Sequence, residues 1–127
     1  SSATTSVGLP LVKEMFSGGT TGVTVVNVGT EPTKIYASYT DQNGIVREFE
    51  TVATVAPGAA VSFFKVYTNP LSRFTGLANF ASLFNTKNSV IISSDGVQPI
   101  VALAQESDQD SSNGLLDVKN YEGFALP

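Results

Sequence analysis

Apolar and polar residues alternate along most of the chain, and turn-forming residues interrupt the alternation roughly every eight to twelve residues. Residues 33–40 show the pattern clearly, because Ile35, Ala37 and Tyr39 occupy alternate positions. A period of two residues is typical of β-strands that bury one face. The pattern therefore predicts about seven to eight short strands in an antiparallel β-sandwich, with a barrel as the less favoured arrangement.

The predicted strands are separated by turn signals. The strongest is Asn43-Gly44, which predicts a hairpin with a type I′ turn, because both central residues of that turn need positive φ. The last predicted segment, residues 115–126, is interpreted either as one strand or as two short strands. We expect strands over residues 22–28, 33–40, 45–55, 60–68, 89–94, 98–106 and 115–126.

Two stretches leave alternatives open. Residues 70–87 place phenylalanine and leucine three or four positions apart, which favours one or two helical turns over a long crossover connection. In residues 45–55, Phe49 shares one face with Arg47, and the opposite face carries Glu48 and two valines. The pattern does not decide which of these two faces points into the core.

The first part of the chain has a different rhythm. Residues 1–7 are small and polar, which indicates a flexible tail. Residues 9–16 predict a short helix with Pro10 in its first turn, with an extended apolar segment as the alternative, and the sequence "SGGTTG" (17–22) predicts a hinge or linker after it. The apolar face of this helix comprises Leu11, Val12, Met15 and Phe16.

We therefore expect an N-terminal tail and docking segment over residues 1–21 and a β-sandwich domain over residues 22–127. The apolar face of the first segment either covers the end of the domain's own core or docks onto another protein subunit. Docking is favoured, because small flexible residues flank the segment on both sides. The expected docking contacts are Leu11, Val12, Met15 and Phe16.

Composition narrows the possible chemistry. The chain contains 127 residues, carries a net charge of −4 and has no Cys, His or Trp. Disulfides, thiolate nucleophiles and imidazole bases are therefore excluded, and we expect no enzyme and no cofactor. The seven basic residues are scattered, so nucleic acid is not an expected partner. No apolar run is long enough to predict a membrane-spanning helix.

Two groups of acidic residues are weak site candidates. Asp108, Asp110 and Asn113 could offer oxygen ligands to Ca²⁺, but their spacing does not match an EF-hand loop. Glu48 and Glu50 could form an acid–base pair of the glycosidase kind, but they are expected on the solvent face of a strand. The many phenylalanines between residues 63 and 84 favour core packing over a carbohydrate-binding platform.

Two longer stretches resemble a known family. The sequence "VTVVNVGTEPTKIYASYTDQNGIVREFETVATVAPGAAVSF", and "NSVIISSDGVQPIVALAQESDQD" followed by "NYEGFALP", resemble bacterial extracellular immunoglobulin-like surface modules over roughly residues 22–127. The leading segment adds a resemblance to the β-rich globular pilin subunit of geopilin type, although this chain has no long hydrophobic pilin helix. These resemblances imply an immunoglobulin-like sandwich and a role at the bacterial surface.

Together, these observations predict a non-enzymatic structural subunit of an extracellular bacterial assembly, such as a pilus or similar filament. Its partners would be other protein subunits, which it would contact through apolar side chains and strand edges. We expect it at the cell surface, exported by a signal peptide that this chain lacks. The alternatives are an adhesin or carbohydrate-binding module, and a viral capsid or decoration subunit.

Overall fold

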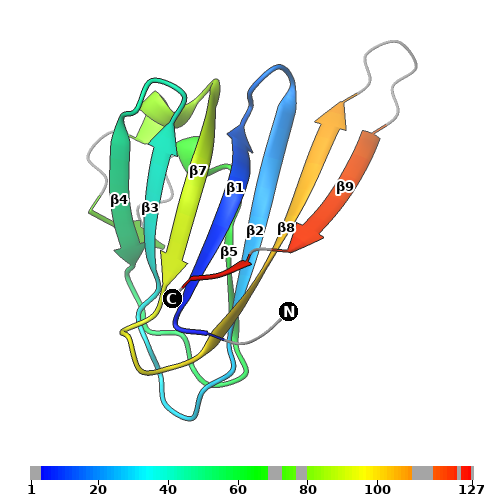
Figure 1. Cartoon of the computed structure of the whole chain (residues 1–127). Helices are drawn as coiled ribbons and strands as arrows, with labels where there is room; N and C mark the ends of the chain where they lie inside the picture. Colours follow the sequence, from blue (N-terminus) through cyan, green and yellow to red (C-terminus); the bar gives the residue numbers. More distant parts are fainter. Residues whose placement is uncertain (1–3, 69–72, 77–79, 110–115, 123, 127) are drawn as a thin grey trace.

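The computed structural model describes residues 4–68, 73–76, 80–109, 116–122 and 124–126 (Figure 1). These residues form ten β-strands and two short 3-10 helices, and no α-helix is found among them. In chain order the elements are β1 (Ser6–Glu14), β2 (Gly19–Asn27), β3 (Tyr36–Asp41), β4 (Val46–Thr51), β5 (Ala60–Phe63), η1 (Val66–Thr68), β6 (Phe74–Thr75), η2 (Phe80–Leu83), β7 (Thr86–Ser93), β8 (Ile100–Gln109), β9 (Leu116–Glu122) and β10 (Phe124–Ala125).

The strands form two packed antiparallel sheets. One sheet has the order β10-β1-β7-β3-β4-β6, and the other has the order β5-β2-β8-β9. Figure 1 shows β4, β3, β7 and β1 side by side, with β2, β8 and β9 side by side beyond β1. The prediction of an all-β, sandwich-like fold is confirmed. The strand count is higher than predicted, because residues 6–14 form β1, the two-residue β6 lies in the connection before β7, and the last segment forms both β9 and β10.

The helical interpretation of residues 9–16 is wrong and the extended alternative is confirmed, because residues 9–14 belong to strand β1. β1 lies between β10 and β7 in the six-stranded sheet. Its register with β7 shifts between Leu9 and Val12, and this β-bulge leaves Pro10 and Leu11 on the surface. Proline suits a bulge, because it has no N–H to donate to a ladder. The bulge also breaks the alternation, which produced the helix-like spacing in the sequence.

The predicted linker "SGGTTG" is a hairpin turn followed by the start of β2. Phe16 and Gly19 exchange two backbone hydrogen bonds of 2.9 Å each. Between them, Ser17 and Gly18 have φ values of 51° and 80°, as a type I′ turn requires. β2 then runs from Gly19 to Asn27, across the expected boundary between residues 21 and 22. Residues 6–14 are therefore part of the sandwich.

The hairpin predicted at Asn43-Gly44 is confirmed, but its turn is not type I′. Only Gly44 has a positive φ, of 81°. The N–H of Gly44 donates to the carbonyl of Asp41 at 3.0 Å, and the N–H of Asp41 donates to the carbonyl of Ile45. The Asp41 carboxylate accepts from the N–H groups of Asn43 and Ile45. This is a type I turn with a glycine bulge, which Asp41 stabilises with its own side chain.

The two open alternatives are also resolved. Residues 80–83 form a single 3-10 turn, η2, within the connection that leads from β5 through the two-residue β6 to β7. On β4, Phe49 is buried while Val46 and Glu48 are exposed. Arg47 shares the inward face and bonds to Asp41 at 2.8 Å. The face of Phe49 and Arg47 is therefore the inner one.

Phe49 is the centre of an aromatic core. Its ring centroid lies 5.1 Å from that of Tyr39 on β3 and 6.0 Å from that of Phe63 on β5, in the opposite sheet. The rings of Phe74 and Phe80 approach it edge-on, at 5.6 and 6.5 Å. Edge-on and tilted ring pairs are favourable beyond the area that they bury. Phe49 thus connects the two sheets and the connection that contains β6 and η2.

Replacing Phe49 by alanine should lower the free energy of unfolding by about 3–5 kcal/mol, since it empties the centre of this cluster. Urea unfolding followed by circular dichroism measures the change. The control is Val46→Ala on the same strand, whose exposed side chain should contribute within about 0.5 kcal/mol. Equal losses in both variants would contradict the assignment of Phe49 to the core centre.

Candidate functional site

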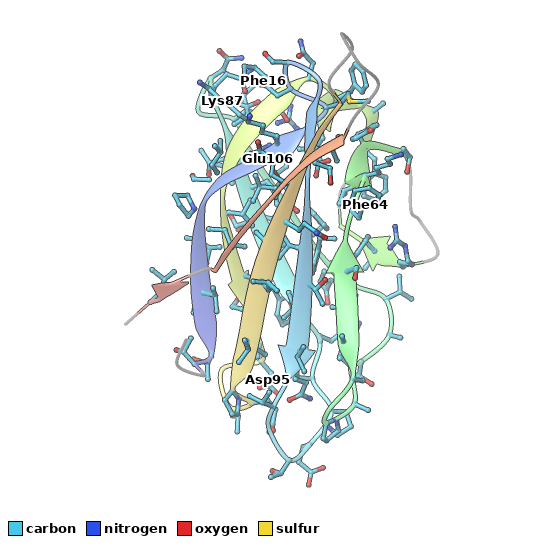
Figure 2. The ribbon with its side chains drawn as sticks, turned by 90° about the vertical axis from the view of Figure 1, so that its right-hand side faces the viewer. Phe16, Phe64, Lys87, Asp95 and Glu106 are labelled. Atoms are coloured by element: carbon cyan, nitrogen blue, oxygen red, sulfur yellow. The ribbon has the colours of Figure 1, made fainter. Side chains whose placement is uncertain are left out.

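The predicted docking residues separate into exposed and buried positions. Leu11 is 37% exposed and Met15 is 36% exposed, while Phe16 is half-buried. Val12 is fully buried and packs into the chain's own core, so it cannot contact a partner. Phe16 and Lys87 lie together at one end of the molecule (Figure 2), with the Lys87 Nζ 5.3 Å from the ring centroid of Phe16.

Phe84 extends this apolar end, although the sequence assigned it to the core. Its side chain is 54% exposed, and its ring meets the half-buried Tyr67 edge-on at 5.2 Å. The next residue, Asn85, donates its backbone N–H to the carbonyl of Glu14 at 2.7 Å. Phe84 is thereby held beside the β1–β2 turn. We call Met15, Phe16 and Phe84 the end surface.

Directly behind the end surface, the core contains a carboxyl group. The Glu14 side chain is 0% exposed and occupies an inward position of β1, two residues after Val12. Neither carboxyl oxygen has a hydrogen-bond partner. Burial raises the pKa of Glu14 from 4.5 to about 8, because the charged form loses its hydration. The carboxyl is therefore mainly protonated at neutral pH.

A second buried polar side chain lies on the neighbouring strand. Asn88 on β7 donates its Nδ2 to the carbonyl of Val12 at 3.3 Å and to the Thr86 Oγ1 at 3.0 Å. Its Oδ1 is buried without a partner. In the β1–β7 ladder, Val12 faces Asn88 and Glu14 faces Thr86. Glu14 and Asn88 are thus diagonal neighbours, and the end of the core holds unsatisfied hydrogen-bond acceptors.

An ion pair joins the two sheets at the same end. The Lys13 Nζ on β1 lies 3.3 Å from the Glu106 Oε2 on β8, and Glu106 is almost fully buried. The backbone N–H of Lys13 also donates to the Thr21 Oγ1 on β2 at 2.9 Å. These contacts hold the end of β1 against the second sheet. Figure 2 shows Glu106 below Phe16 and Lys87.

A further ion pair fixes the β3–β4 hairpin. Arg47 bonds to Asp41 at 2.8 Å and to the Ser82 Oγ at 2.9 Å. Burial by itself raises the pKa of Asp41, but the hydrogen bonds from Arg47 and from the N–H groups of Ile45 and Asn43 outweigh it and hold this pKa below its usual range. This pair therefore ties the hairpin to η2.

The other acidic candidates are placed as follows. Glu48 and Glu50 lie on the outer face of β4, beside an open hollow of about 520 Å³ that Tyr36 also lines. Glu50 makes an ion pair of 3.6 Å with Lys34. Asp108 lies in β8, and Asp110 and Asn113 lie outside the described residues. Within residues that the structure describes, no three or more Asp or Glu side chains gather to hold a metal ion.

The helices in the described part of the chain are too short to span a membrane. None of its helices has both the length and the apolar character needed to cross a bilayer. The two helices found there are 3-10 turns of three and four residues.

Glu14 and Asn88 are the residues that sequence reasoning missed. Their signal is the strand period: Glu14 follows Val12 by two positions, and Asn88 precedes the buried Val90 by two. The helix assigned to residues 9–16 concealed the first position, and the strand predicted from residue 89 excluded the second. Polar residues at inward strand positions are the pattern that could have found them.

Glu14→Gln should remove most of the pH dependence of stability. The pKa of Glu14 is raised in the folded protein, so unfolding releases its proton between about pH 4.5 and pH 8. The wild-type protein should therefore lose ~1.4 kcal/mol of unfolding free energy per pH unit as the pH rises through this window. Urea unfolding at pH 5, 7 and 9 measures the slope.

The control is Glu48→Gln, which neutralises an exposed carboxylate on the outer face of β4. This variant should keep the wild-type slope, and Glu14→Gln should be the most stable of the three proteins at pH 9. A Glu14→Gln variant whose stability follows the wild-type curve at every pH would contradict the assignment.

Comparisons with known proteins bear on the fold. No family model matches the chain, and no curated protein matches its sequence. Among solved structures, the chain is similar to one titled "Crystal Structure of Thermotoga maritima 1070", with a TM-score of 0.64 over 99% of this chain and 97% of that chain. The two chains share 12% sequence identity. At that identity the likeness supports the sandwich-like architecture and nothing finer.

Proposed function

We propose that this chain is a non-enzymatic structural subunit of an extracellular bacterial assembly, such as a pilus or similar filament. The observation that carries the proposal is the end surface, where Met15, Phe16 and Phe84 present apolar side chains to solvent. Apolar side chains that gather on a surface favour contact with another protein. We propose that a second subunit covers them.

The backbone of the end surface favours tight association. The β1–β2 turn is closed by the hydrogen bonds between Phe16 and Gly19, and Asn85 is bonded to Glu14. A preorganised surface loses little conformational entropy when it binds. Full burial of a large apolar side chain contributes roughly 1.5–3 kcal/mol, so the partly exposed Met15 and Phe84 could each supply a fraction of this.

Strand edges provide the second kind of contact in this proposal. β5 is the outer strand of its sheet and pairs only with β2 in the part of the chain that the structure describes. The free edge of a strand offers N–H and C=O groups that can pair with a strand of another chain. β5 is four residues long, so this contact would supplement the apolar one.

The proposal also includes an immunoglobulin-like identity for the sandwich and a location at the cell surface. Both rest on the resemblance of residues 22–127 to bacterial surface modules, whose turn and strand signals agree with several strands observed here. The sparse charge of the chain, 14% of its residues, is compatible with a subunit packed among copies.

Met15→Asn and Phe84→Asp should each weaken self-association, because they place polar groups in the proposed contact. Asparagine suits position 15, where φ is 52°, since it tolerates left-handed backbone. Val97→Asp is the control: Val97 is 73% exposed, and its N–H bonds to Asp95 at the opposite end of the molecule. Analytical ultracentrifugation measures the association, and electron microscopy identifies its form.

Filaments that the two end-surface variants abolish and the control retains would support the proposal. A wild-type protein that stays monomeric across concentrations and salt conditions would contradict it. Closed shells instead of filaments would favour the capsid or decoration role.

One observation favours a carbohydrate-binding module as the second candidate. The hollow on the outer face of β3, β4 and β7 combines the exposed ring of Tyr36 with the carboxylates of Glu48 and Glu50. Sugars stack on aromatic rings through their apolar faces, and carboxylates accept hydrogen bonds from sugar hydroxyls.

If this second function holds, the monomer should bind a glycan, and Tyr36→Ala should lower the affinity by at least about tenfold, the equivalent of 1.4 kcal/mol. A glycan array followed by calorimetry tests this, with Phe64→Ala, an exposed ring directly after β5, as the control. An array without any binding would remove this candidate.

A further inference from the structure

At this end of the core, buried hydrogen-bond acceptors lack donors. The buried atoms without a partner there are the carboxyl oxygens of Glu14 and the Oδ1 of Asn88, and all of them accept hydrogen bonds. The two side chains are on adjacent strands at diagonal inward positions. Buried acceptors without donors are unstable unless a proton, a water molecule or a cation satisfies them.

The proton is the simplest donor, because a protonated carboxyl carries one O–H. The charged groups around Glu14 are engaged elsewhere. From its own strand, Lys13 pairs with Glu106 of β8. From β7, Lys87 lies over the ring of Phe16. From the inner faces of β3 and β4, the charged groups are the mutually paired Asp41 and Arg47, whereas Glu48 and Glu50 lie on the outer face of β4. The described residues of β2 contribute only uncharged side chains.

Next to Glu14, the backbone is strained. Met15 and Ser17 have φ values of 52° and 51°, in the left-handed region that residues other than glycine and asparagine disfavour. The N–H of Asn85 bonds directly to the carbonyl of Glu14. The backbone of Glu14 therefore adjoins the strained β1–β2 turn and is hydrogen-bonded to Asn85.

We propose that the Glu14 carboxyl is a proton switch for the end surface: with its proton bound, the β1–β2 turn stays closed, and without it the turn opens and separates Met15 and Phe16 from Phe84. The effect of this separation on assembly rests on the function proposed above: once Met15 and Phe16 are separated from Phe84, the end surface would no longer bind a second subunit. The switch itself concerns only the local opening of this chain.

The raised pKa of Glu14 sets the range of the switch. An opened turn exposes the carboxyl to water, where its pKa returns toward 4.5. Opening then becomes more frequent by about tenfold per pH unit as the pH rises from about 4.5 to about 8, and levels off above that. The surface is therefore most ordered in mildly acidic conditions.

Amide hydrogen exchange of the full chain tests the switch. The reporters are the N–H groups of Phe16 and Gly19, whose bonds close the β1–β2 turn, and of Asn85, whose bond reaches the end of β1. After correction for intrinsic exchange, their protection should fall about tenfold per pH unit between pH 5 and pH 8. It should be insensitive to low urea concentrations, as local openings are. The amide of Val25 in the core should be better protected and sensitive to urea.

Two variants separate Glu14 from other titrating groups. Glu14→Gln should abolish the pH slope of the three reporters, and Glu48→Gln should retain it. The proposal is overturned if the reporters keep their slope in Glu14→Gln, or if they exchange only by global unfolding with the urea dependence of Val25. Should Glu14→Gln fail to fold, the carboxyl ¹³C titration of wild-type Glu14 decides instead, and an ordinary pKa near 4.5 overturns the proposal.

Sedimentation of the wild-type protein at pH 6 and pH 8.5 measures its self-association, and this measurement tests the assembly role separately from the switch. Local opening in a protein that is monomeric at both pH values supports the switch and contradicts the assembly. Association that is unchanged between the two pH values, with reporters that show no slope, overturns the switch and leaves the assembly role standing.

Discussion

The contact between the inner faces of the two sheets is the interaction on which the rest of the structure depends. Phe49 and Phe63 meet across it at 6.0 Å, and Phe74 and Phe80 bring the β5–β7 connection onto the same cluster. Because strand side chains alternate, each strand must keep its apolar residues in one register to reach this contact. That requirement explains the β-bulge in β1, which returns Val12 to the core after Pro10 and Leu11 point outward.

The same alternation carries polar residues inward at one end of the sandwich. Beyond Val12 the next inward position of β1 is Glu14, and beyond Ala104 the next inward position of β8 is Glu106. Lys13 satisfies Glu106, whereas the Glu14 carboxyl oxygens find no partner. A core that is apolar in the middle and polar at one end is less stable at that end. The exposed Met15 and Phe84 lie over this weaker region.

Sequence reasoning succeeded where period-two alternation was unbroken and failed where one local feature altered it. The strands around Val25, Tyr39 and Ile92 were found because nothing interrupts their pattern. The bulge at Pro10 made the spacing of apolar residues in β1 resemble that of a helix. The glycines after Phe16 resembled a linker, because the sequence alone does not show that they form a turn between two strands. Glu14 could not be recognised as buried without that pairing, because carboxylates are usually exposed.

The short pairing of β10 with β1 determines how the molecule responds to a pulling force. Val7 faces Ala125, Gly8 faces Phe124, and the Leu126 N–H bonds to the Ser6 carbonyl, so the outer ends of the two antiparallel strands lie together. Tension applied at residues 4 and 126 loads the few hydrogen bonds between β1 and β10 one after another, so β10 separates from β1 at low force. A fibre built from such units would bear mechanical load across its lateral contacts and not through the chain ends.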